Sequence, residues 1–456
     1  MVAAGQFQAQ RLHDLIKRER GRYADTHPAS LRAFDAAGAH LLGGVPMTWM
    51  RAWPGGFPLY LATAHGARLT DLDGNEFIDF CLGDTGAMAG HSPAPVQAAV
   101  AGRFGELGGA TTMLPTVDAA WVAGELTRRF CATHWSFTLS ATDANRWALR
   151  LARQLTGRPK VAVFSYCYHG SVDESFVVAT PDGARSREGN TGAPVDPAVT
   201  TRVVEFNDID ALERELAAGD VAVLLMEPAL TNIGIVLPEP GYLAAVREVT
   251  RAAGTLLIND ETHTFSAGPG GCTKAWGLDP DIVTIGKAIG GGIPTGAYGL
   301  SGALAERIMA DESADLIDTG GVGGTLAGNA LSVAAMRATL EQVLTDEAFE
   351  VMIGLAGRFT AGVSEVIASR EVPWTIAQLG ARAEYRFCPS PPRSGGESNA
   401  AADPALDEYL HLYLANRGVL ITPFHNMALM CPATTETDVD AHTEVFGAAV
   451  DELVGT

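Results

Sequence analysis

Cysteine is sparse in this chain of 456 residues, and the six cysteines are scattered along it. None belongs to a Cys-x-x-Cys pair, and no group of them has the spacing of metal ligands. This distribution argues against a disulfide-stapled scaffold or a zinc module and predicts reduced thiols in a cytoplasmic protein. The six are Cys81, Cys131, Cys167, Cys272, Cys388 and Cys431.

Long apolar runs are also missing, because no apolar stretch reaches the 18 residues of a membrane-spanning helix. Residues 1–23 lack the apolar core of a signal peptide and indicate an amphipathic, charged helix. Basic residues are outnumbered, with 32 Lys and Arg against 53 Asp and Glu and a net charge of −21. The acidic balance argues against nucleic acid or an anionic membrane as the main partner. A phosphate ligand would therefore need a local site built from backbone N–H groups.

Glycine is abundant, at 51 residues without a repeat period, which is typical of α/β enzymes with many tight turns. From about residue 90, short apolar runs alternate with amphipathic helical stretches. This pattern predicts an α/β fold whose central sheet is mostly parallel and covered by helices, with the active site at the carboxyl ends of the strands. Strands are predicted over 160–166, 201–206, 221–227, 254–260, 281–287 and 295–301, and helices over 143–155, 208–219 and 241–254.

Three further features lie outside this alternating part. An Asp73-Gly74 pair between short alternating segments predicts a β-hairpin. Residues 331–359 predict one long helix that leads into a final α+β section. Residues 388–405 are low in complexity and predict a mobile loop.

Two predicted strands end on charged residues. Asp260 ends one apolar strand, and Lys287 ends the next, directly before a glycine-rich run. A lysine in a partly desolvated cleft is a nucleophile toward carbonyls, and the glycines allow a ligand to approach the backbone closely. Asp260 alone would more often cap a turn. Together, the two residues suit a carbonyl cofactor whose ring nitrogen needs a counter-ion.

Two other segments could complete such a site. Ser140, Ala141 and Thr142 lie between a predicted strand and a helix, where small hydroxyl residues cap the helix or hold a phosphate. Tyr168 and His169 follow another strand. The ring of Tyr168 could stack on a flat cofactor or could belong to the core.

In order and spacing, these motifs resemble the class III, fold-type I, pyridoxal-phosphate (PLP)-dependent aminotransferases, which include ω-amine transaminases and glutamate-1-semialdehyde aminomutases. The resemblance covers nearly the whole chain and implies a large PLP-binding domain plus a smaller α+β domain from both termini. The expected boundaries are 1–80 and 341–456 for the small domain and 81–340 for the large one. The matching segments are 69–80, 90–93, 140–153, 168–170, 227–243, 259–264, 285–299 and 323–329.

The resemblance also implies roles for single residues. Lys287 would bind PLP as a Schiff base, and Asp260 would keep the ring nitrogen protonated. Thr262 and Tyr168 would lie against the two faces of the ring, and Thr325 would reach the phosphate of the neighbouring subunit in a homodimer. The residues expected to bind the cofactor are Ser140, Ala141, Thr142, Tyr168, His169, Glu227, Asp260, Thr262, Lys287 and Thr325.

Three positions depart from the family pattern. Ala141 stands where the family usually has Gly, and Asp143 stands where it usually has Glu. Both changes are small and leave phosphate binding plausible. His263, in the Asp-Glu-Thr-His-Thr run, is unusual for the family, and we interpret it as a structural histidine.

The resemblance implies an aminotransferase that moves an amino group from a primary amine to an oxo acid such as pyruvate. The expected donor is a hydrophobic amine, an amino alcohol or a β- or ω-amino acid, because Trp49 and its neighbours suggest an apolar wall near the entrance of the site. Packing of the same aromatic residues at a dimer interface is an equal alternative. Arginine would suit the oxo-acid carboxylate. The alternatives are an aminomutase, an epimerase or a silent PLP-binding protein. The candidate substrate residues are Trp49, Arg51, Arg382 and Arg386, with Arg417 as a further arginine.

Overall fold

The computed structural model describes residues 9–130, 132–310 and 320–455. The chain divides into two compact units. The large unit comprises Ala94–Phe349 and Pro392–Ala400, and the small unit comprises Met1–Pro93, Glu350–Pro391 and Ala401–Thr456. The small unit is thus built from both ends of the chain. Its boundaries fall at 93/94 and 349/350, whereas the family resemblance implied 80/81 and 340/341.

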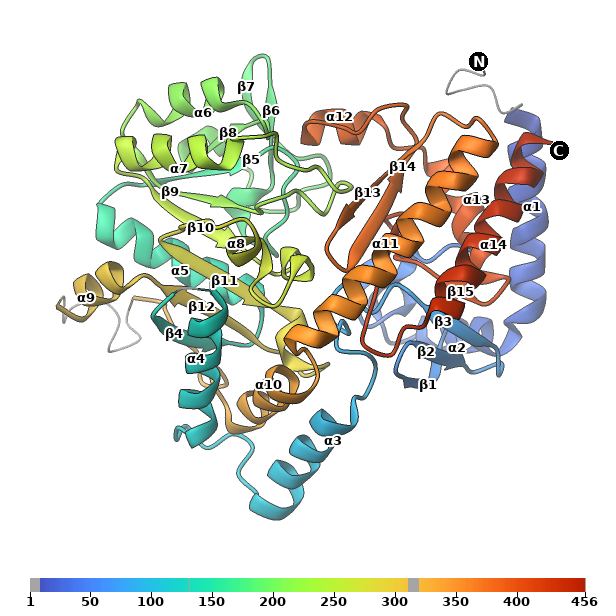
Figure 1. Ribbon diagram of the computed structural model, residues 1–456, viewed down its shortest axis with the longest axis horizontal. Helices are drawn as coiled ribbons and strands as arrows, with labels where there is room; N and C mark the ends of the chain where they lie inside the picture. The colour runs from blue at the N-terminus through green and yellow to red at the C-terminus, as the bar shows by residue number, and fades with distance from the viewer. Residues whose placement is uncertain (1–8, 131, 311–319, 456) are drawn as a thin grey trace. The chain divides into compact units, whose positions relative to one another are not determined.

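A seven-stranded sheet forms the centre of the large unit (Figure 1). All strands run parallel except β12, which is antiparallel to both of its neighbours. In spatial order they are β4 (His134–Thr138), β12 (Gly296–Leu300), β11 (Ile282–Gly286), β10 (Leu256–Asp260), β9 (Val221–Met226), β5 (Lys160–Phe164) and β8 (Thr201–Val204). The mostly parallel sheet that the sequence predicted is confirmed.

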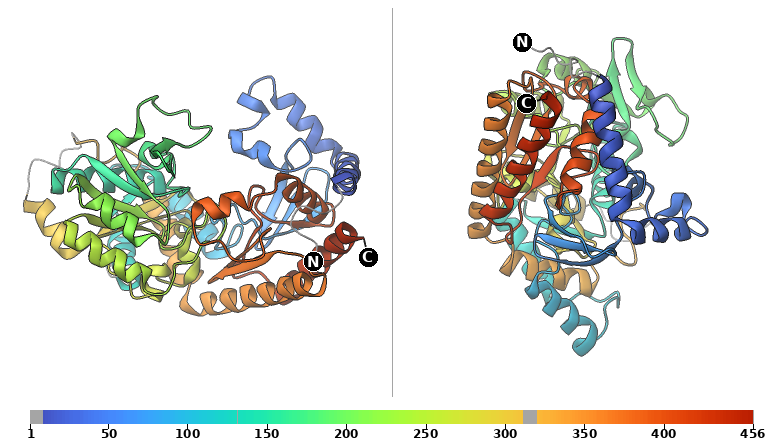
Figure 2. Two further views of the ribbon diagram at one scale, coloured as in Figure 1. Left: turned by 90° about the horizontal axis from the view of Figure 1, so that it is seen from above. Right: turned by 90° about the vertical axis from the view of Figure 1, so that its right-hand side faces the viewer.

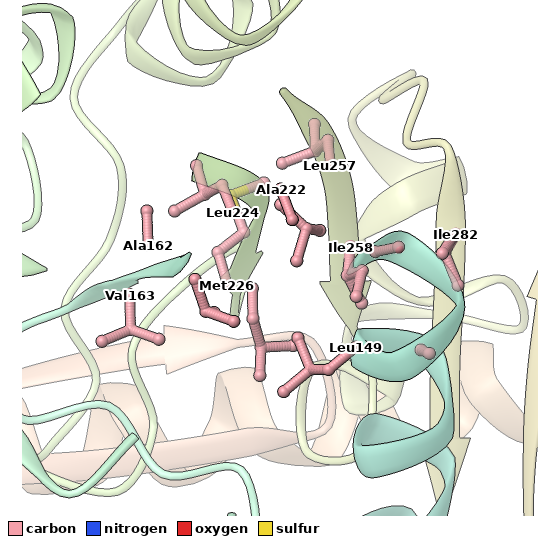
Figure 3. Close-up of a cluster of buried hydrophobic side chains, with 14 of the residues drawn as sticks. Leu149, Ala162, Val163, Ala222, Leu224, Met226, Leu257, Ile258 and Ile282 are labelled. Atoms are coloured by element: carbon pink, nitrogen blue, oxygen red, sulfur yellow. The ribbon is translucent and has the colours of Figure 1, made fainter. Parts of the chain in front are cut away.

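Helices cover both faces of this sheet, as its strand composition requires. The strand β9 is buried along its whole length, and a strand with no polar face needs cover on both sides. Figure 1 shows α6 (Ile209–Leu216) and α7 (Tyr242–Ala253) on one face and α5 (Ala141–Thr156) on the other. Leu149 of α5 lies among the sheet residues Met226 and Ile258 (Figure 3). This packed core fixes the strand ends that carry the site.

The remaining elements of the large unit surround the sheet. The strands β6 and β7 pair as a separate antiparallel hairpin. The π-helical turn Gly102–Leu107 follows α3 directly. The bounds are α3 (Ala94–Ala101), α4 (Val117–Phe130), β6 (Val177–Thr180), β7 (Gly183–Ser186), α8 (Gly271–Ala275), α9 (Gly302–Ala310), α10 (Ala330–Gln342) and α12 (Gly395–Ala400).

The small unit contains two sheets and a layer of helices. The order β1-β2-β3-β15 joins the N-terminal hairpin to a strand from the C-terminal part, and β13-β14-β16 forms the second sheet. The β2–β3 pair confirms the predicted hairpin at Asp73-Gly74. In Figure 2, the blue helix α1 runs beside the red helices of the C-terminal part. The bounds are α1 (Ala9–Thr26), α2 (Pro28–Ala37), β1 (Leu61–His65), β2 (Arg68–Asp71), β3 (Glu76–Asp79), β13 (Thr375–Leu379), β14 (Arg382–Arg386), α13 (Pro404–Ala415), β15 (Val419–Leu420), β16 (Met427–Leu429) and α14 (Glu436–Val454).

The single long helix predicted over 331–359 is wrong. The structure has α10 and then α11 (Asp346–Ser369), because Thr345 begins a new helix by accepting a hydrogen bond from the Ala348 amide at 3.2 Å. By length and composition, α11 is the one described helix that could cross a membrane. However, one face of α11 buries Met352, Phe359 and other apolar residues, which is the pattern of a core helix.

The mobile loop predicted over 388–405 is also wrong in part. Residues 395–400 form α12, and the segment before it is tied to the large unit. Arg393 pairs with Glu239 at 2.5 Å, and Asn207 donates to the Arg393 carbonyl at 2.8 Å. A Cβ on Gly395 would lie 2.3 Å from the Ser165 carbonyl oxygen, so glycine permits the close approach. The small residues that lowered the sequence complexity allow this contact.

Candidate active site

The parallel strands of the large unit end at the same edge of the sheet. Because β4, β5, β9, β10 and β11 are parallel, their carboxyl ends bring together the residues that follow them. Asp260 is the last residue of β10 and pairs in register with Thr284 of β11. Lys287 follows β11 directly and has a φ of 50°, a left-handed conformation that is rare for a residue with a side chain. The rigid sheet therefore holds Lys287 in an unusual geometry.

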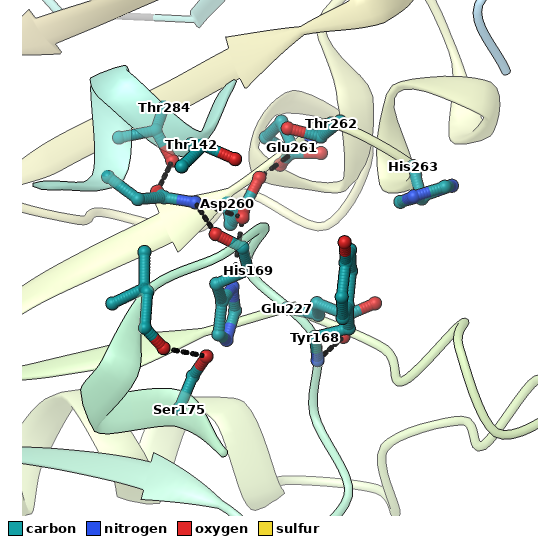
Figure 4. Close-up of polar contacts among 12 residues, drawn as sticks. Thr142, Tyr168, His169, Ser175, Glu227, Asp260, Glu261, Thr262, His263 and Thr284 are labelled. Carbon is teal, nitrogen blue, oxygen red and sulfur yellow. Dashed lines mark hydrogen bonds and ion pairs between the residues drawn. The ribbon is translucent and has the colours of Figure 1, made fainter. Parts of the chain in front are cut away.

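The carboxylate of Asp260 is buried and accepts hydrogen bonds on both oxygens. Its Oδ2 accepts from Asn145 Nδ2 at 2.7 Å and lies 2.9 Å from His169 Nδ1, while its Oδ1 accepts from the Thr262 amide at 3.0 Å (Figure 4). Burial favours the neutral acid, but the hydrogen bond and charge of His169 outweigh it and lower the pKa of Asp260. Asp260 is therefore an anion in a dry environment, which suits a protonated ring nitrogen.

Asn145 was missed by the sequence analysis. It lies on the buried face of α5, and its Oδ1 accepts a hydrogen bond from the Thr284 hydroxyl at 2.6 Å. This bond fixes which way the amide points, so the NH₂ group faces Asp260. A signal was available, because Asn145 falls on the apolar stripe of the helix beside Ala144, Ala148 and Leu149. A buried polar residue on an apolar stripe needs a hydrogen-bond partner in the protein interior.

His169 lies behind Asp260. Its ring is buried, and Nδ1 contacts the carboxylate. Burial disfavours the imidazolium, but Cys167 and the Asp260 carboxylate raise the pKa of His169 well above its usual value. The predicted cofactor residue His169 therefore orients Asp260 and sustains its charge.

Glu227 orients the loop that carries Tyr168. Its Oε1 accepts from the Tyr168 amide at 3.2 Å, and its Oε2 accepts from the amide of Thr231 at 3.0 Å and from the Thr231 hydroxyl. Burial raises the pKa of Glu227. The ring of Tyr168 is 38% exposed and contacts Phe176 edge-on at 6.3 Å between ring centroids. A half-exposed ring held in this way can serve as a stacking platform.

The start of α5 forms the anion-binding end of the site. Ser140 caps the helix by accepting from the Asp143 amide at 3.2 Å, and the hydroxyl of Thr142 accepts from the Ser171 amide at 3.3 Å. The first amides of a helix have no partner within it and favour a phosphate. A Cβ on Gly286 would lie 2.9 Å from the Ala141 amide nitrogen, so the backbone before Lys287 packs directly on this helix start.

These groups fit PLP as a set. Lys287 matches the aldehyde, the anionic Asp260 matches the ring nitrogen, and the start of α5 matches the phosphate. The side chain of Thr262 is also buried, two residues after Asp260.

His263 contacts Lys287. Its Nε2 lies 2.9 Å from Lys287 Nζ, and its ring is buried. The interpretation of His263 as a purely structural residue missed this contact, because its neighbour lies 24 positions away in the sequence. Only the pairing of β10 with β11 brings the two side chains together.

The predicted substrate residues all belong to the small unit. The ring of Trp49 is exposed and meets Phe424 edge-on at 5.9 Å, and Arg51 is exposed. Arg382 is 1% exposed, donates to the Thr85 hydroxyl at 2.6 Å and lies 3.8 Å from Asp84. Arg386 is also buried. Thr325, the residue predicted to reach a neighbouring subunit, is exposed in the large unit.

Comparison with known proteins identifies the family. The model of the class-III aminotransferases matches residues 50–450. This chain belongs to that family. It is 34% identical over 421 residues to the glutamate-1-semialdehyde 2,1-aminomutase of Chloroflexus aggregans, covering 89% of this chain and 94% of the relative.

Solved structures agree with the family. A glutamate-1-semialdehyde-aminomutase from Pseudomonas aeruginosa PAO1, solved also in complex with PMP, matches with a TM-score of 0.94 and 49% identity over 97% of this chain and 99% of that one. An omega-transaminase from Sphaerobacter thermophilus matches with a TM-score of 0.84 and 29% identity over 93% and 98% of the chains. The predicted fold-type I architecture and the PLP cofactor are confirmed, and the chain is a class-III PLP-dependent enzyme.

Proposed function

We propose that this enzyme transfers an amino group from a hydrophobic primary amine to an oxo acid such as pyruvate. The observation that carries the choice of substrate is the exposed aromatic pair of Trp49 and Phe424. Large apolar side chains left in water favour contact with an apolar ligand. Amino alcohols with a long chain and β- or ω-amino acids with an apolar side chain fit the same surface.

PLP, when bound, supplies an electron sink for charge that develops on the amine carbon. Asp260 keeps that sink polarised, because His169 and Asn145 hold its carboxylate ionised in the protein interior. Lys287 moves a proton at the substrate carbon with its Nζ, which acts as the general base and acid. Tyr168, whose amide donates to Glu227, would lie against one face of the ring.

Arg51 is the arginine that we assign to the carboxylate of the oxo acid. It is exposed, and it lies in the segment 46–53, which resembles a substrate-contacting region of the aminomutases. Arg382 suits this role less well, because Thr85 and Asp84 already hold its guanidinium in the small unit. A bidentate arginine pair would orient the acceptor for transfer.

A 2,1-aminomutase is the second candidate. The relative from Chloroflexus aggregans, at 34% identity, carries that name, and the structure from Pseudomonas aeruginosa, at 49% identity, is named a glutamate-1-semialdehyde-aminomutase. An aminomutase uses the same lysine and the same ring chemistry, but it moves the amino group within one molecule. The difference is therefore the need for a separate acceptor.

One assay separates the two functions. PLP-loaded enzyme is incubated with pyruvate and a panel of hydrophobic amines, β-amino acids and ω-amino acids, and alanine is measured. In parallel, glutamate 1-semialdehyde is supplied without an acceptor, and 5-aminolevulinate is measured. Alanine from hydrophobic amines, lost in Lys287→Ala and reduced in Trp49→Ala, supports the transaminase. Isomerisation without alanine formation overturns it in favour of the aminomutase.

A further inference from the structure

We infer that His263 is a positioning residue that takes up and returns the proton of Lys287 Nζ. The two nitrogens, Nε2 and Nζ, lie 2.9 Å apart, which is hydrogen-bond distance. Transaminase and aminomutase share the lysine chemistry, so the inference rests only on the use of Lys287 as the cofactor-binding residue and stands under either candidate function.

The chemistry of lysine makes such a partner useful. An ammonium group has no lone pair, so Lys287 must lose a proton before Nζ can attack a carbonyl or accept a proton from substrate. A neutral imidazole can accept a proton, and the imidazolium that forms can return it near neutral pH. Transfer across the contact converts Lys–NH₃⁺ and neutral His into Lys–NH₂ and His–H⁺, and the reverse step restores both. The proton is conserved within the pair.

The turn that carries His263 is held rigidly. Glu261 accepts hydrogen bonds from the Thr264 hydroxyl at 2.5 Å, from the Cys272 amide at 3.0 Å and from Thr273 through both its amide and its hydroxyl at 2.6 Å. The amide of Phe265 also donates to the Glu261 carbonyl at 2.9 Å. This network fixes the backbone on one side of His263, and the position of Asp260 in the sheet fixes the other.

Lys287, the partner of His263 in this contact, is fixed as well. Lys287 begins a short 3₁₀ turn, Lys287–Gly290, directly after β11, and its φ of 50° restricts where its side chain can start. Two anchored backbones therefore aim their side chains at one contact. A contact between two fixed groups costs less conformational entropy than one between mobile side chains.

Other titratable groups in this part of the large unit bear on the pH dependence. Figure 4 shows Asp260, at the end of the strand that leads to His263, and Tyr168, His169 and Glu227 on neighbouring segments. Asp260 and Glu227 are buried carboxyl groups, and His169 is paired with Asp260. All four remain in place when His263 alone is changed, so a difference between wild type and variant isolates the histidine.

The test measures capture of PLP by apoenzyme, followed as the absorbance of the lysine-bound cofactor between about pH 6 and about pH 10.5. His263→Gln keeps a hydrogen-bonding side chain of similar reach but cannot accept and carry a proton. We expect capture near pH 7 to slow by about 10- to 100-fold, as for the loss of a general base, and to converge with wild type near pH 10.5. The exposed His134→Gln, on β4 of the same unit, is the matched control and should behave as wild type.

A second variant, His263→Asn, is tested in the same way as His263→Gln, and only variants with wild-type circular dichroism are used. Equal capture at all pH values overturns the inference. A slowing that is the same at every pH also overturns it, because a purely structural role predicts no pH dependence. If wild-type enzyme captures PLP but forms no alanine from any donor, that result counts against the proposed transaminase and not against the role of His263.

Discussion

Asp260 gathers partners from three separate segments, namely Asn145 on α5, His169 after β5 and the Thr262 amide two residues on. Each partner donates to or pairs with the carboxylate, so the charge survives burial. Without them, desolvation would drive the group to its neutral form. The negative charge available to the cofactor ring therefore depends on these three partners as well as on Asp260.

Replacement of Asp260 by Asn removes that charge while keeping the size of the side chain. We expect the rate of amino transfer to fall by about 100- to 1000-fold, because the developing negative charge loses electrostatic support. The measurement is the turnover number for alanine formation with saturating PLP. Retention of the lysine-bound absorbance serves as the control, and wild-type turnover in a loaded variant would contradict the role.

The His169→Gln variant tests the buried ion pair through pH. The pKa of His169 is raised, so its contribution to stability is fully present below about pH 6.5 and is lost as the pH rises through the raised pKa. The pKa of Asp260 is lowered, so its contribution is present above about pH 4 and is lost as the pH falls through the lowered pKa.

Wild-type apoenzyme should therefore exceed His169→Gln in thermal stability most clearly at about pH 5 to 6.5, by about 2 kcal/mol for a hydrogen bond to a charged group. The difference in stability between wild type and His169→Gln should become smaller toward alkaline pH. Melting temperatures of both apoenzymes across the pH range give the comparison. An excess that does not change between about pH 6 and about pH 10 would show that the pair is not ionised as described.

At the scale of elements, the contact between the end of β11 and the start of α5 depends on glycine. A Cβ on Gly286 would meet the Ala141 amide nitrogen and Cβ at 2.9 Å. Gly286→Ala should push the helix start away from Lys287 and weaken PLP binding by about tenfold or more, since the clash involves backbone. Gly124→Ala, on α4 with nothing within 4 Å of the new Cβ, should leave binding unchanged. Equilibrium titration of each apoenzyme with PLP decides the matter.

The break between α10 and α11 depends on Thr345. Thr345→Ala should lower stability by about 1 kcal/mol because the Ala348 amide loses its cap, while Thr345→Ser should be nearly neutral. Thermal unfolding of both variants provides the measurement. The sequence carried this signal, since Thr345 is followed by Asp346 and Glu347, which are typical of a first helical turn. The apolar periodicity continues from α10 into α11, so it predicted one helix in spite of this helix-start signal at Thr345.

The apolar pattern of β12 predicts a strand but not the direction in which it runs. The strand now labelled β12 was predicted over 295–301, but it runs antiparallel to β11. Only residues 287–295 connect the two strands, which is too short for the crossover that parallel neighbours need. The connection length could therefore have given the direction, although the apolar composition of the strand could not.

At the scale of the molecule, exposed apolar side chains support the predicted homodimer. Within the described part of the large unit, a stretch after α3 exposes five large hydrophobic residues, and such patches mark interaction sites. They are Phe104, Leu107, Met113, Leu114 and Val117. A second copy of the chain would cover them and bring Thr325 to the neighbouring site, as the family resemblance implies.

The double variant Phe104→Glu with Leu107→Glu tests this assembly. Both side chains are exposed on the π-helical turn, at 70% and 71%, so the isolated chain should fold normally. Wild type should scatter light with twice the chain mass of 47.8 kDa, and the variant should shift toward one chain mass and lose activity. The exposed apolar residue Val199, away from this stretch, gives the control Val199→Glu. A wild-type monomer would contradict the prediction.

From local patterns, namely apolar strands, turn glycines and charged strand ends, the sequence predicted the mostly parallel sheet and the strand-end positions of Asp260 and Lys287. The resemblance of its motifs to the class III aminotransferases implied the family and the PLP cofactor. Only the tertiary structure showed Asn145 and His169 holding the Asp260 carboxylate and His263 against Lys287. Those contacts join residues 24 to 115 positions apart. Their partners are chosen by strand order and helix packing, which no local pattern encodes.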